Sequence, residues 1–208
     1  MPAPAKLLLA SSNPGKLAEF RALAESLASA GRVELACIPG FASLPSFEET
    51  APTFGENAAG KACHYSRLVD FPVLADDSGL VVPALSGAPG VRSARYGGPG
   101  ASDADKVKKL LSEMRGKSGS QRAAQFVCVL AVAEQGRVLA VVSDFAAGEL
   151  LDSPRGTGGF GYDPVFYVPE LRKTFAELTR EEKNGLSHRG KAFRRLMQSY
   201  VANSKSRT

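Results

Sequence analysis

The chain has 208 residues, of which 44% are hydrophobic and 23% charged, and its formal net charge is +5 at pH 7. This is ordinary globular composition, and a chain of this length buries a sizeable core without disulfides or a structural metal. The mild positive charge suits a polyanionic small substrate as well as a nucleic acid, so it does not choose between them. Because no apolar stretch approaches the length of a membrane span, we expect a cytoplasmic protein without a membrane partner.

The three cysteines are far apart in the sequence. Cys37, Cys63 and Cys128 show no CxxC or Cys/His spacing, which argues against a disulfide framework and against a zinc site. Cys128 lies in the apolar run 126–130, where we expect a buried, reduced thiol.

The chain opens with a strand, a turn and a helix. The short apolar run at residues 6–11 predicts a buried strand, and turn-forming residues follow it directly. Pro14 suits the first position of a helix, whose apolar residues then recur at helical spacing until Gly31. A second strand is predicted at residues 33–38.

A loop rich in Pro, Ser and Glu at residues 39–52 precedes the next helix. Thr53 and Glu56 match the capping-box pattern, which predicts a helix through about Val69. His64 lies in the middle of that helix, where a packing role is expected.

The second half begins with a segment dense in Gly and Pro at residues 84–100, which predicts a long ordered loop. Ser102 can cap a helix that runs to about Arg115. The β-rich segments 121–133 and 137–147 flank a short turn, and they predict a long hairpin.

The last part of the chain combines a glycine-rich stretch at residues 156–161 with two helical patterns. Thr179 starts a short charged segment, Ser187 caps a final helix, and residues 203–208 are expected to form a frayed tail. Helices alternate with strands early and a hairpin comes later. The sequence therefore predicts an α/β fold with a mixed β-sheet, as one domain over residues 1–208.

A candidate phosphate site lies where the first strand meets the first helix. It consists of Ser11, Ser12, Asn13, Pro14, Gly15 and Lys16. Backbone N–H groups and the helix dipole favour a phosphate there, and Lys16 adds a positive charge. The segment is not a P-loop, because the upstream glycine is absent and Leu17 replaces the magnesium-binding hydroxyl residue. A tight turn with a solvated lysine is the alternative.

Two adjacent acids, Asp76 and Asp77, lie at the end of a short strand predicted at residues 72–76. Open α/β sheets bind ligands at this edge, where a carboxylate can hold Mg²⁺ or accept a proton from water. Adjacent strand residues point to opposite faces, so only one of the pair is expected to face a cleft. An Asp-Ser-Gly turn that ends the strand is the alternative. Glu48 and Glu49 are candidate second ligands, or part of a solvated acidic loop.

Candidates for purine recognition lie in the last third of the chain. Glycines at residues 158–161 let the backbone approach a ligand, and the ring of Phe160 or Tyr162 can stack on a purine; a turn with core aromatics is the alternative. His188 and Arg189 can donate hydrogen bonds to a purine O6 or to phosphate. Basic residues are unfavourable at a helix N-terminus, which weakens a purely structural explanation.

Six motifs occur in one order from about Leu8 to Leu196. They are Ser12-Asn13-x-Gly15-Lys16, Thr53-Phe54-x-Glu56-Asn57-Ala58, Ala75-Asp76-Asp77-Ser78-Gly79-Leu80, Gly87-Ala88-Pro89-Gly90-x-x-Ser93-Ala94-Arg95-Tyr96, Gly156-Thr157-Gly158-Gly159-Phe160-Gly161-Tyr162-Asp163-Pro164 and Leu186-Ser187-His188-Arg189-Gly190. Together they resemble the inosine triphosphate pyrophosphatase family, in its bacterial dITP/XTP-cleaving form. The family's phosphate turn often begins with Thr-Gly or Thr-Ser, whereas Ser11 and Ser12 stand here and offer the same hydroxyl and N–H groups.

The resemblance implies a homodimer built on a long mixed sheet flanked by helices, with two lobes bordering a substrate cleft. It also implies Mg²⁺ as cofactor and the hydrolysis of ITP, dITP and XTP to monophosphate and pyrophosphate, which removes aberrant purines from the nucleotide pool. Asp77 would be the proton acceptor and a metal ligand, with Glu48 as its partner. Residues 11–16 would bind the triphosphate, helped by Lys61 and Lys183. The nucleotide pocket would be shaped by Ser78, Phe160, Gly161, Tyr162, Asp163, His188 and Arg189.

Two other functions compete with this one. A Maf-type pyrophosphatase, which acts on modified pyrimidine or 7-methylated nucleotides, would share a phosphate turn and a catalytic acid, but the motifs at residues 158–163 and 187–189 argue against it. A basic, non-enzymatic nucleotide- or RNA-binding protein would show surface aromatics interleaved with Lys and Arg and would not need Asp76 and Asp77. The sequence therefore predicts an enzyme for a purine nucleoside triphosphate, without a nucleic-acid partner.

Overall fold

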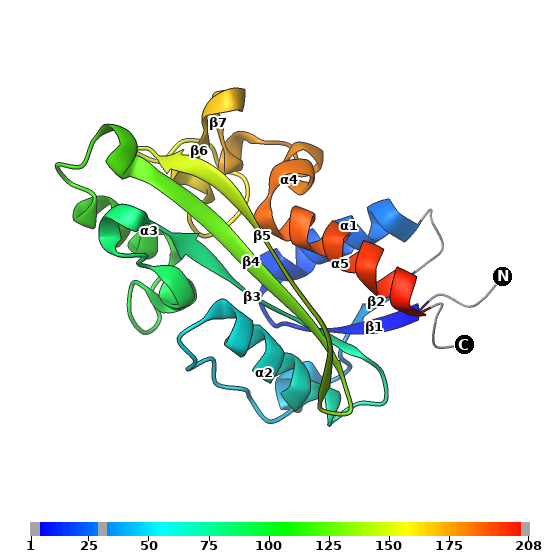
Figure 1. The fold of residues 1–208 in the computed structure, drawn as a ribbon. Helices are drawn as coiled ribbons and strands as arrows, with labels where there is room; N and C mark the ends of the chain where they lie inside the picture. Colours follow the sequence, from blue (N-terminus) through cyan, green and yellow to red (C-terminus); the bar gives the residue numbers. More distant parts are fainter. Residues whose placement is uncertain (1–4, 29–32, 205–208) are drawn as a thin grey trace. The chain divides into compact units, whose positions relative to one another are not determined.

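Seven strands form one mixed sheet in the computed structural model, which describes residues 5–28 and 33–204 (Figure 1). Along the sheet the strands follow the order β2-β1-β3-β4-β5-β6-β7. Their bounds are β1 Ala5–Ala10, β2 Val33–Cys37, β3 Val73–Val81, β4 Ala123–Glu134, β5 Arg137–Leu150, β6 Phe166–Val168 and β7 Lys173–Thr174. β1 pairs in parallel with β2 and β3, and β6 pairs antiparallel with β5 and β7.

Five α-helices are found in the described residues, and short 3₁₀ turns connect several elements. The helices are α1 Pro14–Ala28, α2 Phe54–Ser66, α3 Asp103–Glu113, α4 Arg180–Leu186 and α5 His188–Ser204. The predicted α/β fold, with a mixed sheet flanked by helices, is confirmed. No helix of the described part is long and apolar enough to cross a membrane.

The chain divides into two compact units. Unit 1 takes in residues 1–77, 128–144 and 190–208, and unit 2 takes in residues 78–127 and 145–189. The predicted single domain with a cleft between two lobes stays a prediction.

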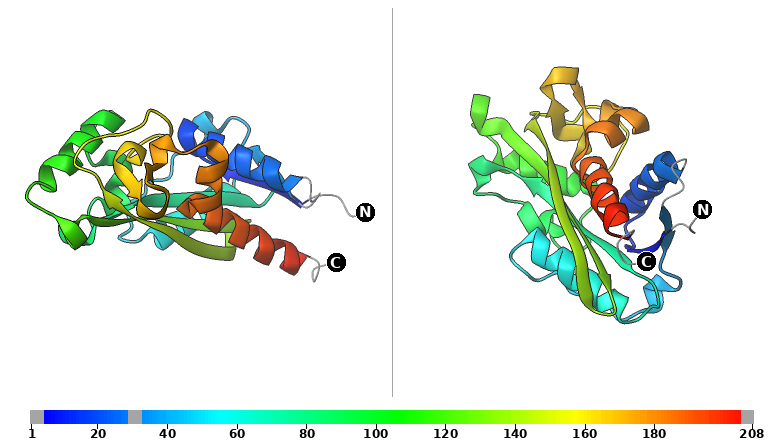
Figure 2. Two further views of the ribbon diagram at one scale, coloured as in Figure 1. Left: turned by 90° about the horizontal axis from the view of Figure 1, so that it is seen from above. Right: turned by 45° about the vertical axis from the view of Figure 1, so that its right-hand side comes forward.

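In unit 1 both faces of the sheet are covered. Leu7 and Leu9 of β1 join a cluster with Phe20 of α1 and Phe193 of α5, whose ring centroids lie 5.7 Å apart, and Figure 2 shows these two helices side by side. The intervening Leu8 joins the cluster under α2 on the opposite face. This alternation follows from the two-residue period of a strand, and it explains why β1 is apolar at successive positions from Leu7 to Ala10.

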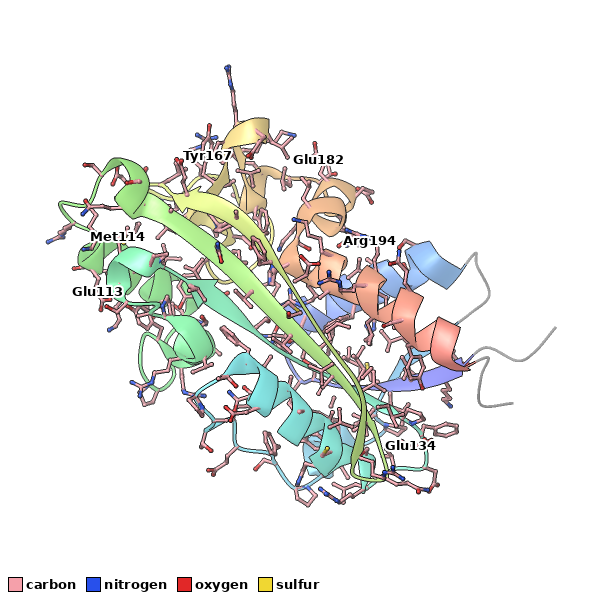
Figure 3. The ribbon with its side chains drawn as sticks, in the orientation of Figure 1. Glu113, Met114, Glu134, Tyr167, Glu182 and Arg194 are labelled. Carbon is pink, nitrogen blue, oxygen red and sulfur yellow. The ribbon has the colours of Figure 1, made fainter. Side chains whose placement is uncertain are left out.

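Unit 2 has a core of its own. Phe166 contacts the rings of Phe126 and Phe175, with centroids 4.6 and 4.7 Å apart. Next to each other at the end of α3, Met114 is buried in this core and Glu113 is exposed; both are labelled in Figure 3. The predicted Ser102 cap of α3 is confirmed, because its hydroxyl accepts a hydrogen bond from the Asp105 N–H.

β3 is longer than predicted, which changes the setting of the two acids. The strand was expected to end at Asp76, but it continues to Val81. The alternative of an Asp-Ser-Gly turn is therefore wrong. The parallel pairing with β1 does stop at Ala75, so the acids follow directly where β1 ends.

β3 continues past Asp76 because Gly79 does not form a turn. Its missing side chain instead allows the segment of Gly90 and Ser93 to approach the strand closely. A Cβ atom there would lie 2.4 Å from the Ser93 Oγ and 2.5 Å from the Gly90 carbonyl oxygen. The Ser93 hydroxyl accepts a hydrogen bond of 2.9 Å from the Leu80 N–H, which keeps the chain extended.

The other differences concern element ends and short strands. α2 ends at Ser66, earlier than about Val69, and β5 reaches Leu150 instead of residue 147. β6 and β7 were not predicted, because two or three residues are too few for a periodicity to show. Of the tail predicted to be frayed, Asn203 and Ser204 belong to α5, and the rest lies outside the described residues.

Candidate functional site

The turn between β1 and α1 is ordered by its own side chains. The Ser11 hydroxyl accepts a hydrogen bond from the Asn13 N–H at 3.2 Å, and the Asn13 Oδ1 accepts one from the Lys16 N–H at 3.0 Å. α1 therefore begins at Pro14, as predicted. Its first turn contains no acid, so the positive end of the helix dipole can serve an anion.

Lys16 reaches from this turn to β3. Its ammonium group forms an ion pair with the carboxylate of Asp76, which is only 1% exposed. The thiol of the buried Cys128 contacts the Asp76 Oδ2 at 3.4 Å. A buried charge requires such compensation, so Asp76 is best explained as the group that holds Lys16 at the turn.

Asp77 lies on the opposite face of β3, toward α2. Its side chain is 4% exposed and hydrogen-bonded to Asn57 of α2. Burial, with smaller effects from Glu49 and Asp76, raises the pKa of Asp77 to about 6, against the hydrogen bond from Asn57 and the charge of Lys16. Thus only one acid of the pair is directed to the α2 side, as the alternation predicts.

One oxygen of Asp77 is available for chemistry. Within residues 5–28 and 33–204, no hydrogen-bond partner reaches the buried Oδ2. A carboxylate with a pKa near 6 is largely ionised at neutral pH and still basic enough to take a proton from water. The arrangement therefore fits a general base, a cation ligand, or both.

Glu49 is the loop acid beside this site. Its carboxylate pairs with the Lys61 ammonium group at 2.6 Å, and Lys61 also donates to the Asp76 carbonyl oxygen at 3.2 Å. Glu49 also raises the pKa of Asp77, whereas Glu48 is exposed. The geometry favours Glu49 over Glu48, so the choice of Glu48 as second ligand gains no support.

In unit 2, Asp163 organises the glycine-rich segment. Its Oδ2 accepts hydrogen bonds from the Phe160 N–H at 2.8 Å and from the Lys183 ammonium group at 2.5 Å. Lys183 was expected to help bind the triphosphate; here it is 7% exposed, and its Nζ lies 5.1 Å from the Phe160 ring centroid. The Gly161 N–H donates to Asp103 of α3 at 2.6 Å, which anchors the same segment.

The start of α5 adds a second cation to this group. The Arg189 guanidinium donates to the Ser78 hydroxyl at 2.8 Å and lies 5.7 Å from the Phe160 ring centroid. His188 stacks on Phe126, with centroids 4.8 Å and planes 10° apart. Both basic side chains are buried, and their contacts with Ser78 and Phe126 fix their positions.

The two aromatic candidates differ in their surroundings. Tyr162 is 4% exposed, and its hydroxyl donates to the Ser93 carbonyl oxygen at 2.9 Å, so it is a core residue. Phe160 is partly exposed and flanked by Lys183 and Arg189. Phe160 is therefore the ring that can stack on a base.

The predicted site residues fall into two groups, one in each unit. Unit 1 holds residues 11–16, Lys61, Asp77 and the loop acids, and unit 2 holds Ser78 and the other nucleotide-pocket candidates. The sequence interpretation gave no role to Asn57. The sequence did offer a signal for Asn57. Its amide lies one helical turn before Lys61, in the same motif as the helix-capping Thr53.

The model of the Ham1 family matches residues 7–199 of this chain. A curated dITP/XTP pyrophosphatase from Geobacillus kaustophilus is 49% identical over 205 residues, which is 98% of each protein. Another from Thermus thermophilus is 47% identical over 195 residues, covering 94% of this chain and 91% of the relative.

Solved structures share this fold. A HAM1 protein from Coxiella burnetii has a TM-score of 0.83 and 42% identity, and the match covers 95% of this chain and 99% of that one. The Ham1 protein of Staphylococcus aureus has a TM-score of 0.82 and 37% identity, with the same coverage.

The raised pKa of Asp77 predicts a stability effect. Because the folded state binds this proton more tightly than the unfolded state, stability is lost as the pH rises through about 6. In EDTA at pH 7.5, Asp77→Asn should raise the melting temperature by several degrees, since a shift of this size corresponds to about 1–3 kcal/mol. Thermal melts followed by circular dichroism measure this.

The exposed Asp70 provides the control, because Asp70→Asn should leave the melting temperature unchanged both at pH 7.5 and near pH 4. The gain from Asp77→Asn should shrink as the pH is lowered toward 4. An Asp77→Asn protein that melts below the wild type at pH 7.5 would contradict the assigned burial penalty.

Proposed function

The chain belongs to the Ham1 family, and we propose that it hydrolyses deaminated purine nucleoside triphosphates (ITP, dITP and XTP) to the monophosphate and pyrophosphate. The observation that carries this proposal is the buried carboxylate of Asp77, whose open oxygen lies in the unit that also holds the phosphate-binding turn. Its proposed role in the cell is to remove deaminated purines before polymerases incorporate them.

The triphosphate is bound through unit 1. The N-terminus of α1 offers backbone N–H groups and a positive dipole end, and Lys16 adds a charge held in place by Asp76. Lys61 of α2 reaches β3, where its ammonium group bridges the Glu49 carboxylate and the Asp76 carbonyl oxygen. These groups favour a polyanion over a neutral substrate.

We propose Mg²⁺ as the cofactor, and the residues present fit it. The Asp77 Oδ2 and the carboxylate of Glu49 are hard oxygen donors, and Mg²⁺ commonly takes one or two protein carboxylates while keeping several waters. Within the described ranges, no three acidic, His or Cys side chains gather as a metal cage. When bound, the cation neutralises charge on the phosphate oxygens.

In the hydrolytic step Asp77 orients a water and accepts its proton. The water oxygen attacks the α-phosphorus, the bond from this phosphorus to the α–β bridging oxygen breaks, and pyrophosphate leaves with the electron pair. Lys16 and the α1 N–H groups stabilise the negative charge that develops on the leaving group. Asp76 serves instead as the ion-pair partner that holds Lys16 at the turn.

The purine is recognised through unit 2. Phe160 provides a ring for stacking, and Arg189, which can only donate, suits the O6 acceptor of hypoxanthine or xanthine. Adenine presents an amino donor at this position and leaves the guanidinium unpaired, which can discriminate by about 10⁴-fold or more. The homodimer, the cytoplasmic location and the absence of a nucleic-acid partner stay predictions.

Substrate selectivity is the first test. We expect pyrophosphate release from ITP, dITP and XTP in Mg²⁺, with little from GTP or ATP, measured by a coupled pyrophosphate assay. EDTA should stop turnover, and added Mg²⁺ should restore it. Release from none of these nucleotides would overturn the proposed function and leave the family assignment intact.

Asp77→Asn should lower kcat by about 10²–10⁴-fold, because an amide cannot take the proton of the water. Steady-state kinetics with ITP measure the loss, and Asp70→Asn serves again as the control. Near-normal turnover in the Asp77→Asn enzyme would remove Asp77 from the mechanism.

Arg189→Lys should lower kcat/KM for ITP by roughly 10–100-fold, because a lysine cannot reproduce the fixed geometry of the guanidinium donors. The ratio of ITP to ATP turnover should fall with it. Arg195→Lys is the matched control on the exposed side of α5. An unchanged ITP to ATP ratio in the Arg189→Lys enzyme would place base selection elsewhere.

A further inference from the structure

The segment of residues 45–51, here called the acidic loop, is fastened along one face of α2. The helix residues that hold it are spaced by three or four positions, so they share that face. They are Asn57, Gly60, Lys61, His64 and Tyr65. Loop and helix run in opposite directions, so each turn of the helix meets a new part of the loop.

The far end of the acidic loop is held by two aromatic side chains. The His64 Nε2 lies 2.9 Å from the Pro45 carbonyl oxygen, and the Tyr65 hydroxyl accepts a hydrogen bond from the Phe47 N–H at 3.3 Å. The Phe47 ring packs on Gly60, where an added Cβ would lie 2.7 Å from the ring. His64 therefore has a holding role beyond packing.

The near end is held by Asn57, which is fully buried. Its Oδ1 accepts a hydrogen bond from the Ala51 N–H at 2.9 Å, and its Nδ2 donates to the Ala51 carbonyl oxygen at 3.3 Å. The same side chain is hydrogen-bonded to Asp77. Because a backbone N–H can only donate, Oδ1 is the acceptor, and the two N–H groups of Nδ2 serve Ala51 and Asp77.

The hydrogen bonds that hold the acidic loop to α2 act against the repulsion between two carboxylates. Lys61 contacts both the Glu49 carboxylate and the Asp76 carbonyl oxygen, so Glu49 is held close to Asp77, and two like charges held close together repel each other. The Lys61 ion pair offsets part of the charge, but Lys61 is a flexible side chain that also serves Asp76. The rigid amide of Asn57 ties the backbone of the acidic loop to the Asp77 carboxylate itself.

We propose that Asn57 is a positioning residue of the hydrolytic site, whose amide joins the acidic loop to Asp77 and so keeps Glu49 beside that carboxylate. The expected effect on catalysis rests on the proposed function, whereas the contacts of Asn57 do not depend on it. Only an amide supplies one acceptor and two donors here, since aspartate lacks the donors and serine has one. Carboxylates held in advance cost less reorganisation when a cation binds.

The test uses Asn57→Asp, which keeps the size and the acceptor and removes both donors. In the full chain with EDTA and no substrate, amide hydrogen exchange over residues 45–51 should become at least about tenfold faster. With ITP and Mg²⁺, kcat should fall by about 10²-fold while KM changes less than about threefold. The reason is that the substitution displaces the carboxylates at the reacting centre and leaves the groups that bind the nucleotide in place. Gln198→Glu, an amide-to-acid change on the exposed face of α5, should alter neither.

Tyr65→Phe serves as a milder variant in case Asn57→Asp folds poorly. It removes only the hydroxyl that holds the Phe47 N–H, so exchange at the far end of the loop should rise and kcat should fall by less than in Asn57→Asp. Exchange over residues 45–51 that stays within twofold of the wild type in both variants overturns the proposal. So does a loosened loop with unchanged kcat. A wild type that hydrolyses none of the nucleotides refutes the proposed function instead, and the substrate-free exchange still decides whether Asn57 holds the loop.

Discussion

Two adjacent carboxylates are buried in the middle of one strand, and much of unit 1 is arranged around them. Burying a charge is costly unless it is paired, and the strand directs Asp76 and Asp77 to opposite faces, so each face needs its own solution. Toward α1, Asp76 has the full charge of Lys16 beside it. Toward α2, Asp77 has a neutral amide from Asn57, and its penalty is not fully offset.

This asymmetry divides structural from chemical roles. The paired acid fixes a lysine at the turn where α1 begins, which prepares a place for phosphates. The underpaired acid keeps an open oxygen and a pKa near neutrality, which a proton acceptor or a cation ligand needs. Active sites commonly retain groups that destabilise the fold, as the buried Asp77 carboxylate does. Here the acidic loop, fastened to α2, also keeps the negative charge of Glu49 beside Asp77.

In unit 2, polar and charged side chains hold the glycine-rich segment and the start of α5 in place. Asp163 gathers the Phe160 backbone and the Lys183 ammonium group, while Arg189 is aligned by Ser78. These contacts place two cations near the ring of Phe160. Donors of this kind suit a purine with an oxygen at C6 and disfavour adenine, which carries an amino group there.

Local chemistry in the sequence determined the strand-turn-helix at residues 5–28, the Thr53 cap of α2 and the opposite directions of Asp76 and Asp77, because these depend on neighbours within four positions. Six ordered motifs also indicated the family. Only the tertiary structure decided that Gly79 continues a strand, that Glu49 lies beside Asp77, and that Asn57 joins the acidic loop to it. Each of these depends on atoms brought together from distant parts of the chain, through close approach and buried hydrogen bonds that no local pattern encodes.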